Sequence, residues 1–149
     1  MDSITISSFN CKNVKTSMHD IKKLCSSSQI LFLQETWLTS SEAHILSDID
    51  DNFYARSVTA IDSTSCVLRG RPHGGIAVMW HKQLSGCKVI ETGDSRLLCF
   101  EILSDNCSIL FINVYLPCDS YDNCDNFLYY LGKISSIINE HPAIDHLSA

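Results

Sequence analysis

Residues 30–33 form the apolar run Ile-Leu-Phe-Leu, and this run constrains the fold more than any other feature of the sequence. A strand with one face in water alternates apolar and polar side chains. A strand that is apolar at every position is typical of a sheet covered on both faces. Such a strand needs a layer of helix or of a second sheet on each side. The run therefore predicts a layered α/β architecture.

The neighbouring segments alternate between strand and helix patterns. Ile4–Phe9 is expected to be a strand that ends at Asn10, and the apolar spacing from Met18 to Cys25 predicts a helix capped by Thr16 or Ser17. A short helix is expected through Ala43, Ile45, Leu46 and Ile49, with Ser40 or Ser41 as its cap and Glu42 in its first turn.

The middle of the chain is richer in strand patterns. Strands are expected over residues 53–60, 75–80, 87–91, 97–103 and 109–116, and the last two form the clearest hairpin, joined by Ser104–Ser108. The longest helix is expected before His141-Pro142, with one apolar face made of Phe127, Leu128, Leu131, Ile134, Ile137 and Ile138. The order of elements predicts β-sandwich-like sheets flanked by helices. No glycine-rich nucleotide loop occurs.

Composition excludes several classes of protein. A chain of 149 residues, 45% of them hydrophobic, can form one globular domain and is not a disordered tail. No apolar run approaches the roughly 20 residues that cross a bilayer, and no secretory signal is recognised, so an intracellular protein is expected, nuclear or cytoplasmic. The eight cysteines include no C-x-x-C pair, which favours reduced cysteines over a zinc site; Cys25, Cys99 and Cys107 are expected to pack as small apolar residues.

Candidate site residues follow the ends of three strand patterns. Asn10, Glu35 and Tyr115 each come directly after such a pattern, and in α/β proteins ligands gather where strand ends open into a crevice. An amide oxygen and a carboxylate suit Mg²⁺, and a phenol can donate to a phosphate oxygen. The alternative is that these side chains are polar because the chain leaves the core there.

Four short segments carry a resemblance to a known family. They are Ser8-Phe-Asn10, Gln34-Glu-Thr-Trp37, Arg71-Pro-His-Gly-Gly-Ile-Ala-Val78 and Asn113-Val-Tyr-Leu-Pro117, in that order. Together they resemble the endonuclease/exonuclease/phosphatase superfamily, most of all the apurinic-type endonuclease domain of LINE-type (non-LTR) retrotransposons. The likeness runs from Ser3 to about Asn139.

The resemblance implies a Mg²⁺-dependent phosphodiesterase that nicks DNA. Glu35 corresponds to the metal-binding glutamate of the family, Asn10 to the asparagine that helps to place the metal-bound water and the phosphate, and Tyr115 to the tyrosine at the scissile phosphate. The His73-Gly74-Gly75 segment corresponds to a loop beside the site, with His73 expected as a surface or packing residue. Trp37 is expected to pack in the core or in a loop, with base stacking as the alternative.

The sequence also departs from the family pattern. Lys12 stands where many members have an acid, and the later Gly-Asp-x-Asn and Ser-Asp-His motifs are absent. The chain is therefore expected to be a single domain over residues 1–149, incomplete at its C-terminus, with Mg²⁺ weakly held or absent and little activity alone. The net charge of −6 predicts weak DNA binding. The alternatives are a non-catalytic retroelement fragment with uncovered sheet edges and a small-molecule phosphoesterase relative.

Overall fold

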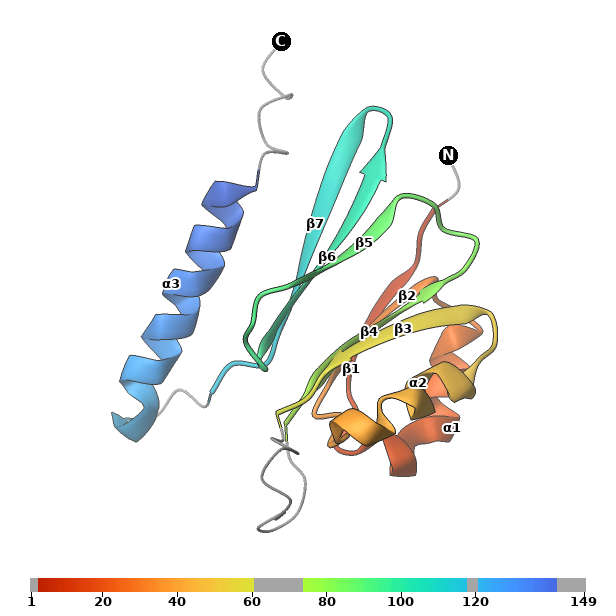
Figure 1. The fold of residues 1–149 in the computed structure, drawn as a ribbon, viewed down its shortest axis with the longest axis horizontal. Helices are drawn as coiled ribbons and strands as arrows, with labels where there is room; N and C mark the ends of the chain where they lie inside the picture. Colours follow the sequence, from red (N-terminus) through yellow and green to blue (C-terminus); the bar gives the residue numbers. More distant parts are fainter. Residues whose placement is uncertain (1–2, 61–73, 118–120, 142–149) are drawn as a thin grey trace.

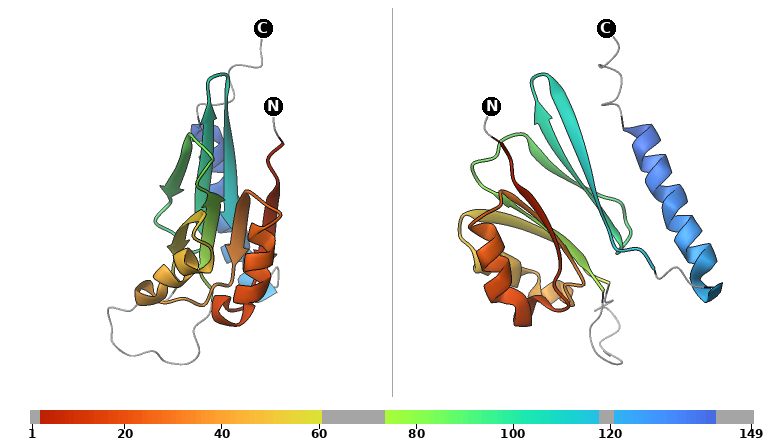
Figure 2. Two further views of the ribbon diagram at one scale, coloured as in Figure 1. Left: turned by 90° about the vertical axis from the view of Figure 1, so that its right-hand side faces the viewer. Right: turned by 180° about the vertical axis from the view of Figure 1, so that it is seen from behind.

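The computed structural model describes residues 3–60, 74–117 and 121–141. Two β-sheets pack face to face, with helices α1 and α2 on the outer side of the first sheet and helix α3 beside the second (Figure 1). The same layers are seen from behind in Figure 2. The predicted layered α/β architecture is confirmed.

The first sheet contains both strands of the strand–helix–strand unit that opens the chain. Its strand order is β1-β2-β4-β3, with β1 parallel to β2 and the other pairs antiparallel. Strand β2 is buried at four of its five positions, as its apolar run predicts. The strands are β1 (Ile6–Asn10), β2 (Ile30–Gln34), β3 (Phe53–Val58) and β4 (Ile76–His81).

The second sheet is an antiparallel meander. Strands β5 (Cys87–Glu91), β6 (Leu97–Ser104) and β7 (Cys107–Val114) follow one another in space as in sequence. The predicted hairpin is confirmed, with β6 and β7 paired from Leu97–Val114 to Ser104–Cys107. Between the sheets Phe32 meets Phe100 edge to face, with ring centroids 6.1 Å apart. The interlocked aromatic side chains hold the two sheets together.

Helix α1 (Val14–Cys25) begins earlier than predicted. Its cap is Asn13, whose side chain accepts a hydrogen bond from the backbone N–H of Lys15 at 3.0 Å, so the expectation of Thr16 or Ser17 was wrong. The physical reason is Val14, which is fully buried beneath the first sheet and draws the first turn inward. Apolar periodicity alone did not include this residue.

The segment before helix α2 (His44–Ile49) also differs from the prediction. A separate 3₁₀ turn, η1 (Ser40–Glu42), precedes the helix, and its cap is Thr39 rather than Ser40 or Ser41. The backbone N–H of Thr39 donates to Glu42 Oε2 at 3.0 Å, and the N–H of Glu42 donates to the Thr39 carbonyl at 3.0 Å. The Thr39 side chain and the Glu42 carboxylate also form a capping box with each other's backbone N–H groups, which stabilises the start of a helix.

Helix α3 (Cys124–Glu140) follows a 3₁₀ turn, η2 (Tyr121–Asn123), and lies beside the second sheet without burying any residue. Leu128, Leu131 and Ile138 of the predicted apolar face are more than 40% exposed. The helix is attached by polar contacts instead, from Tyr130 and Lys133 to Asp94 and from His141 to Glu101. The helix itself is confirmed, but the packing of its whole apolar face is not.

The described cysteines are free thiols. Cys25 and Cys99 are buried as predicted, whereas Cys107 is exposed because it begins the outer strand β7 at the hairpin turn. Burial raises the pKa of the Cys25 thiol to about 11, which keeps it protonated and unreactive. In the part of the chain that the structure describes, no helix is long and apolar enough to cross a membrane.

Candidate metal and phosphate site

Asn10, Glu35 and Tyr115 come together at one end of the two sheets. Asn10 is the last residue of β1, Glu35 comes directly after β2, and Tyr115 comes directly after β7. Because β1 and β2 are parallel with Asn10 opposite Gln34, their polar ends leave the first sheet side by side. The second sheet brings Tyr115 to them from across the sandwich.

One carboxylate oxygen is the centre of this cluster. The Asn10 amide Nδ2 donates to Glu35 Oε1 at 2.8 Å, and the Tyr115 hydroxyl donates to the same oxygen at 2.9 Å. The Asn10 carbonyl oxygen Oδ1 accepts from the backbone N–H of Lys12 at 3.3 Å. Glu35 is therefore oriented by two donors that lie 25 and 80 residues away from it in sequence.

The environment of Glu35 favours its ionised form. The hydrogen bond from Asn10 lowers the pKa of the Glu35 carboxyl, and the bond from Tyr115 and the positive charge of Lys12 lower it further, against a smaller opposing effect of burial. The indole of Trp37 also acts in the lowering direction, although its Nε1 has no partner at hydrogen-bond distance among the residues that the structure describes. The Glu35 carboxyl therefore favours its negatively charged form, which can attract a cation at this end of the molecule.

The backbone at the site is held in an uncommon conformation. Glu35 and Trp37 have φ values of 54° and 55°, in the left-handed region that side chains other than glycine rarely adopt. The carbonyl of Glu35 accepts from Asn13 N at 2.9 Å, and Trp37 N donates to the Gly74 carbonyl at 3.0 Å. Strained backbone fixed from both sides in this way is typical of functional sites.

The glycine pair before β4 supports this bend. Gly74 and Gly75 have φ values of 69° and 83°, and the Gly75 carbonyl accepts from Thr36 N at 3.1 Å. A Cβ at Gly75 would lie 2.5 Å from Thr36 Oγ1, so only glycine fits there. Glycine here therefore lets this backbone lie close against the segment that follows β2. His73 lies outside the described residues.

Two residues that sequence reasoning did not identify hold Tyr115 and Glu35 in place. Asn113, buried in β7, donates through Nδ2 to the carbonyls of Leu33 at 3.2 Å and Ala77 at 2.9 Å, which ties the second sheet to the first. Its Oδ1 accepts from Gln34 Nε2 at 2.8 Å. Asn113 stands in one of the quoted segments, and its place inside an apolar strand was the available signal.

Arg96 is the second of these residues. Its Nη1 donates to the Tyr115 carbonyl at 3.0 Å, and the guanidinium lies 5.3 Å from the centre of the Tyr115 ring. The backbone N–H of Tyr115 donates back to the Arg96 carbonyl at 3.0 Å. Only the pairing of β6 with β7 reveals this contact, so no local pattern could have indicated it.

The donor set suits a hard cation but is small. Glu35 supplies one carboxylate and Asn10 one amide oxygen, and Mg²⁺ is usually held by one or two carboxylates and several waters. Among the described residues no group of three or more His, Cys, Asp or Glu side chains is placed to hold a metal ion. The charge of Lys12 beside Glu35 opposes a cation. The residues present therefore fit a weak site.

Trp37, half-buried beside this site, is partly packed as predicted. Its unsatisfied indole N–H faces no partner among the described residues, and buried tryptophan nitrogens normally have one.

Solved structures of nucleases share this fold. The chain superposes on an AP endonuclease from Archaeoglobus fulgidus with a TM-score of 0.62 and 16% identity, over 90% of this chain and 50% of that one. It superposes on the endonuclease domain of TRAS1, a telomere-specific non-LTR retrotransposon, with a TM-score of 0.55 and 14% identity, over 93% of this chain and 55% of that one. It superposes on the 3′ phosphatase NExo from Neisseria, bound to product DNA hairpin, with a TM-score of 0.59 and 13% identity, over 93% of this chain and 54% of that one.

These likenesses define the class of fold. The chain has the endonuclease/exonuclease/phosphatase fold that the resemblance predicts. It spans about half the length of the solved structures that it matches. No protein-family model matches the sequence, and no curated protein matches it at a significant level of similarity.

Proposed function

We propose that this chain carries the metal- and phosphate-binding part of a Mg²⁺-dependent DNA phosphodiesterase of the retroelement type, and that it has little or no activity alone. The observation that carries the proposal is the convergence of Asn10 and Tyr115 on one oxygen of Glu35. The fold shared with the AP endonuclease, NExo and TRAS1 structures supports DNA as the substrate class.

Each residue has a distinct expected role. The Glu35 carboxylate and the Asn10 amide oxygen would hold Mg²⁺, which neutralises charge on a phosphate when it is bound. The Tyr115 hydroxyl, placed by Arg96, would donate to a phosphate oxygen instead of to Glu35. These groups can bind and orient a phosphodiester, but none of them is a base placed to activate water.

The small donor set also supports the second candidate function, a non-catalytic retroelement fragment. One carboxylate beside Lys12 leaves a cation poorly held, and the net charge of −6 weakens contact with DNA. Both candidates predict weak activity of the chain alone. They differ in whether Glu35 binds a divalent ion at all.

A plasmid-nicking assay tests the proposed chemistry. The chain is incubated with supercoiled DNA in Mg²⁺ or in EDTA, alongside Glu35→Gln and, as a matched control, Glu91→Gln at an exposed carboxylate that pairs with Arg56 rather than with a residue of the site. We expect no nicking above background from any of the three. Mg²⁺-dependent nicking that is lost only in Glu35→Gln would overturn the inactivity. Equal Mg²⁺-dependent nicking by the chain and by Glu35→Gln would overturn the role of Glu35.

A further inference from the structure

The turn between β5 and β6 joins helix α3 to the candidate site. Asp94 lies in this turn, and its side chain is only 12% exposed. One carboxylate oxygen, Oδ1, accepts from the backbone N–H of Arg96 at 2.9 Å and from the hydroxyl of Tyr130 at 3.1 Å. The other oxygen, Oδ2, accepts from Lys133 Nζ at 2.9 Å. A largely buried carboxylate with three donors is held in one orientation, because hydrogen bonds to a charged group are the strong ones.

The turn itself is closed by further hydrogen bonds. Thr92 Oγ1 donates to the Leu97 carbonyl at 2.8 Å and accepts from the backbone N–H of Asp94 at 3.3 Å. The N–H of Leu97 donates to the Asp94 carbonyl at 3.4 Å. Leu97 is fully buried, so the turn is anchored in the core directly after Arg96. The Arg96 side chain therefore leaves the turn from a backbone that is fixed on both sides.

Arg96 carries this fixed geometry to Tyr115. Its Nη1 donates to the Tyr115 carbonyl at 3.0 Å, and the N–H of Tyr115 donates to the Arg96 carbonyl at 3.0 Å. The guanidinium also lies 5.3 Å from the centre of the tyrosine ring. The Tyr115 hydroxyl in turn donates to Glu35 Oε1 at 2.9 Å. A continuous series of contacts therefore runs from α3 through Asp94 and Arg96 to this hydroxyl.

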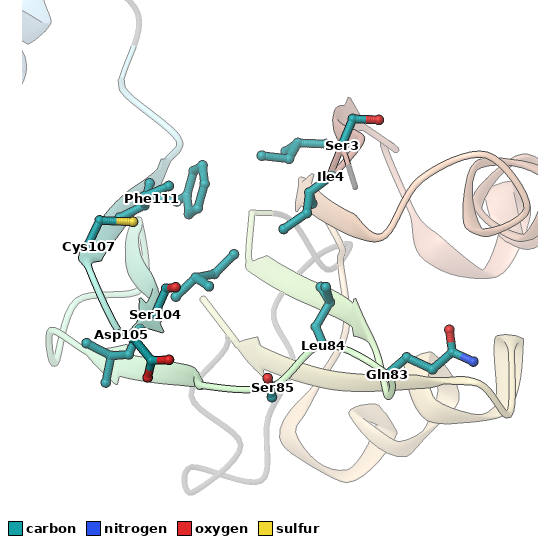
Figure 3. Close-up of a pocket in the computed structure, with 13 residues that line it drawn as sticks. Ser3, Ile4, Gln83, Leu84, Ser85, Ser104, Asp105, Cys107 and Phe111 are labelled. Atoms are coloured by element: carbon teal, nitrogen blue, oxygen red, sulfur yellow. The ribbon is translucent and has the colours of Figure 1, made fainter. Parts of the chain in front are cut away.

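The packing between the two sheets is incomplete at the end of β7 opposite to Tyr115. A hollow of about 670 Å³ lies there, lined by residues of the β6–β7 turn and by Ile4, which precedes β1. Figure 3 shows Ile4 and Phe111 on opposite sides of this hollow. The position of Tyr115 therefore depends on contacts at its own end of the strand, where Asn113 ties the sheets together and Arg96 holds the backbone.

Electrostatics make Asp94 sensitive to the position of the helix. Burial raises the pKa of its carboxyl, but the hydrogen bonds from the Arg96 backbone and from α3 outweigh this effect and hold the pKa below its ordinary value. The carboxylate is therefore negatively charged at neutral pH, opposite the ammonium of Lys133. Because little water reaches Asp94, withdrawal of the helix donors would leave this charge poorly solvated.

We propose that Asp94 is a positioning residue for Tyr115, through which helix α3 sets the orientation of the hydroxyl at the phosphate site. While α3 is docked, Asp94 holds Arg96, and Arg96 holds the backbone and the ring of Tyr115. When α3 loses its contacts with Asp94, the turn relaxes and the hydroxyl leaves Glu35. The positioning is argued from the hydrogen bonds alone, whereas its consequence for phosphate binding rests on the proposed function.

The carbon-13 NMR signal of the Tyr115 ring carbon Cζ tests this directly, because its chemical shift responds to the hydrogen bond of the hydroxyl. The chain is labelled at tyrosine Cζ, and Tyr115→Phe identifies the signal among those of the five tyrosines. Glu35→Ala, which removes the acceptor, gives the reference position for a hydroxyl without this bond. The signal is then recorded in Asp94→Ala, in Asp94→Asn and in the double variant Tyr130→Phe/Lys133→Met.

We expect Asp94→Ala to move the signal most of the way to its position in Glu35→Ala. The double variant leaves Asp94 in place and removes only the donors of α3, so it should move the signal in the same direction by a smaller amount. Asp94→Asn keeps an oxygen that can accept from Arg96, so its signal should stay near the original position. Glu101→Ala is the matched control, since it removes the other carboxylate that contacts this helix, at His141, and should leave the signal unchanged.

Phosphate binding is followed on the same signal by titration with inorganic phosphate, in Mg²⁺ or in EDTA. The dissociation constant should rise about fivefold in Asp94→Ala, which corresponds to the loss of one typical hydrogen bond. It should not change in Glu101→Ala. This arm separates the position of the hydroxyl from its use in binding.

Two results would overturn the proposal. One is a Tyr115 signal that stays in place in Asp94→Ala; if that variant does not fold, as tryptophan fluorescence would show, an unmoved signal in the double variant has the same force. The other is an equal movement in Glu101→Ala, because general loosening of the helix would then be sufficient. A signal that moves as expected but never responds to phosphate would support the positioning role and count against the proposed function.

Discussion

Replacement of Asn113 by leucine tests how the two sheets are held in register at the site. The side chain is 4% exposed and makes three hydrogen bonds, to Leu33 O, Ala77 O and Gln34 Nε2. A typical hydrogen bond contributes about 1 kcal/mol net. The loss of three bonds, offset by roughly 1 kcal/mol from the added apolar burial, should lower the free energy of unfolding by about 2 kcal/mol.

Asn113→Asp separates this effect from a change of volume. The aspartate has the same shape but places carboxylate oxygens against the Leu33 and Ala77 carbonyls, so it should destabilise the fold more than leucine at pH 7. Burial and the carbonyl oxygens should raise the pKa of this carboxyl in the folded state. The Asn113→Asp variant is then most stable below the pKa that this carboxyl has in the unfolded chain, and that stability is lost as pH rises through the pKa that it has in the folded chain.

Urea unfolding followed by tryptophan fluorescence, at pH 7 and at about pH 4, measures both variants against the unmodified chain. The loss in free energy of unfolding caused by Asn113→Asp should be smaller at the lower pH, whereas the loss caused by Asn113→Leu should not change. A leucine variant within about 0.5 kcal/mol of the unmodified chain would refute the reasoning, because changes of that size are normal for surface positions.

Three further predictions concern the surroundings of the site. Gly75→Ala should destabilise the chain by about 2 kcal/mol or more, and Gly93→Ala by only about 1 kcal/mol in the same unfolding assay, because both have positive φ but only the first Cβ meets a neighbour. Glu42→Gln should lower the free energy of unfolding by about 0.5–1 kcal/mol at pH 7, a small effect because Lys15 and Glu42 are partly exposed and their ion pair is screened by solvent. The hydrogen bond from Lys15 is the main cause that lowers the pKa of Glu42 to about 2. The difference in stability should therefore be complete above the unfolded pKa of 4.5 and vanish as pH falls through about 2. Lys12→Glu should tighten Mg²⁺ binding by about tenfold in a calorimetric titration, because it replaces an opposing charge with a ligand.

Much of the fold could be predicted because its strands are marked locally. The run at Ile30–Leu33 is buried as its pattern requires, and the β6–β7 hairpin is marked by two strand patterns around a polar turn. The positions of Asn10 and Glu35 at neighbouring strand ends follow from a parallel pair. Their contact is a short-range consequence of one strand–helix–strand unit.

The rest depends on contacts between distant segments. Tyr115 reaches Glu35 across 80 residues; the strand-end pattern and the family resemblance both indicated Tyr115, but neither gave this contact. Arg96 acts through strand pairing, which no local pattern indicates. Asn113 acts through packing of one sheet on the other, and its only local signal is a polar residue inside an apolar strand. The apolar stripe of α3 predicted a buried helix, but Leu128 and Leu131 are more than 40% exposed and no residue of the helix is fully buried.

Divalent-ion binding tests the central claim most directly. Mn²⁺, a spectroscopic substitute for Mg²⁺ that takes the same oxygen ligands, is titrated into the chain, Glu35→Gln and Glu91→Gln, and free ion is counted by electron paramagnetic resonance. The account predicts one weak site that is lost in Glu35→Gln and retained in Glu91→Gln. Binding that is equal in all three proteins would contradict it.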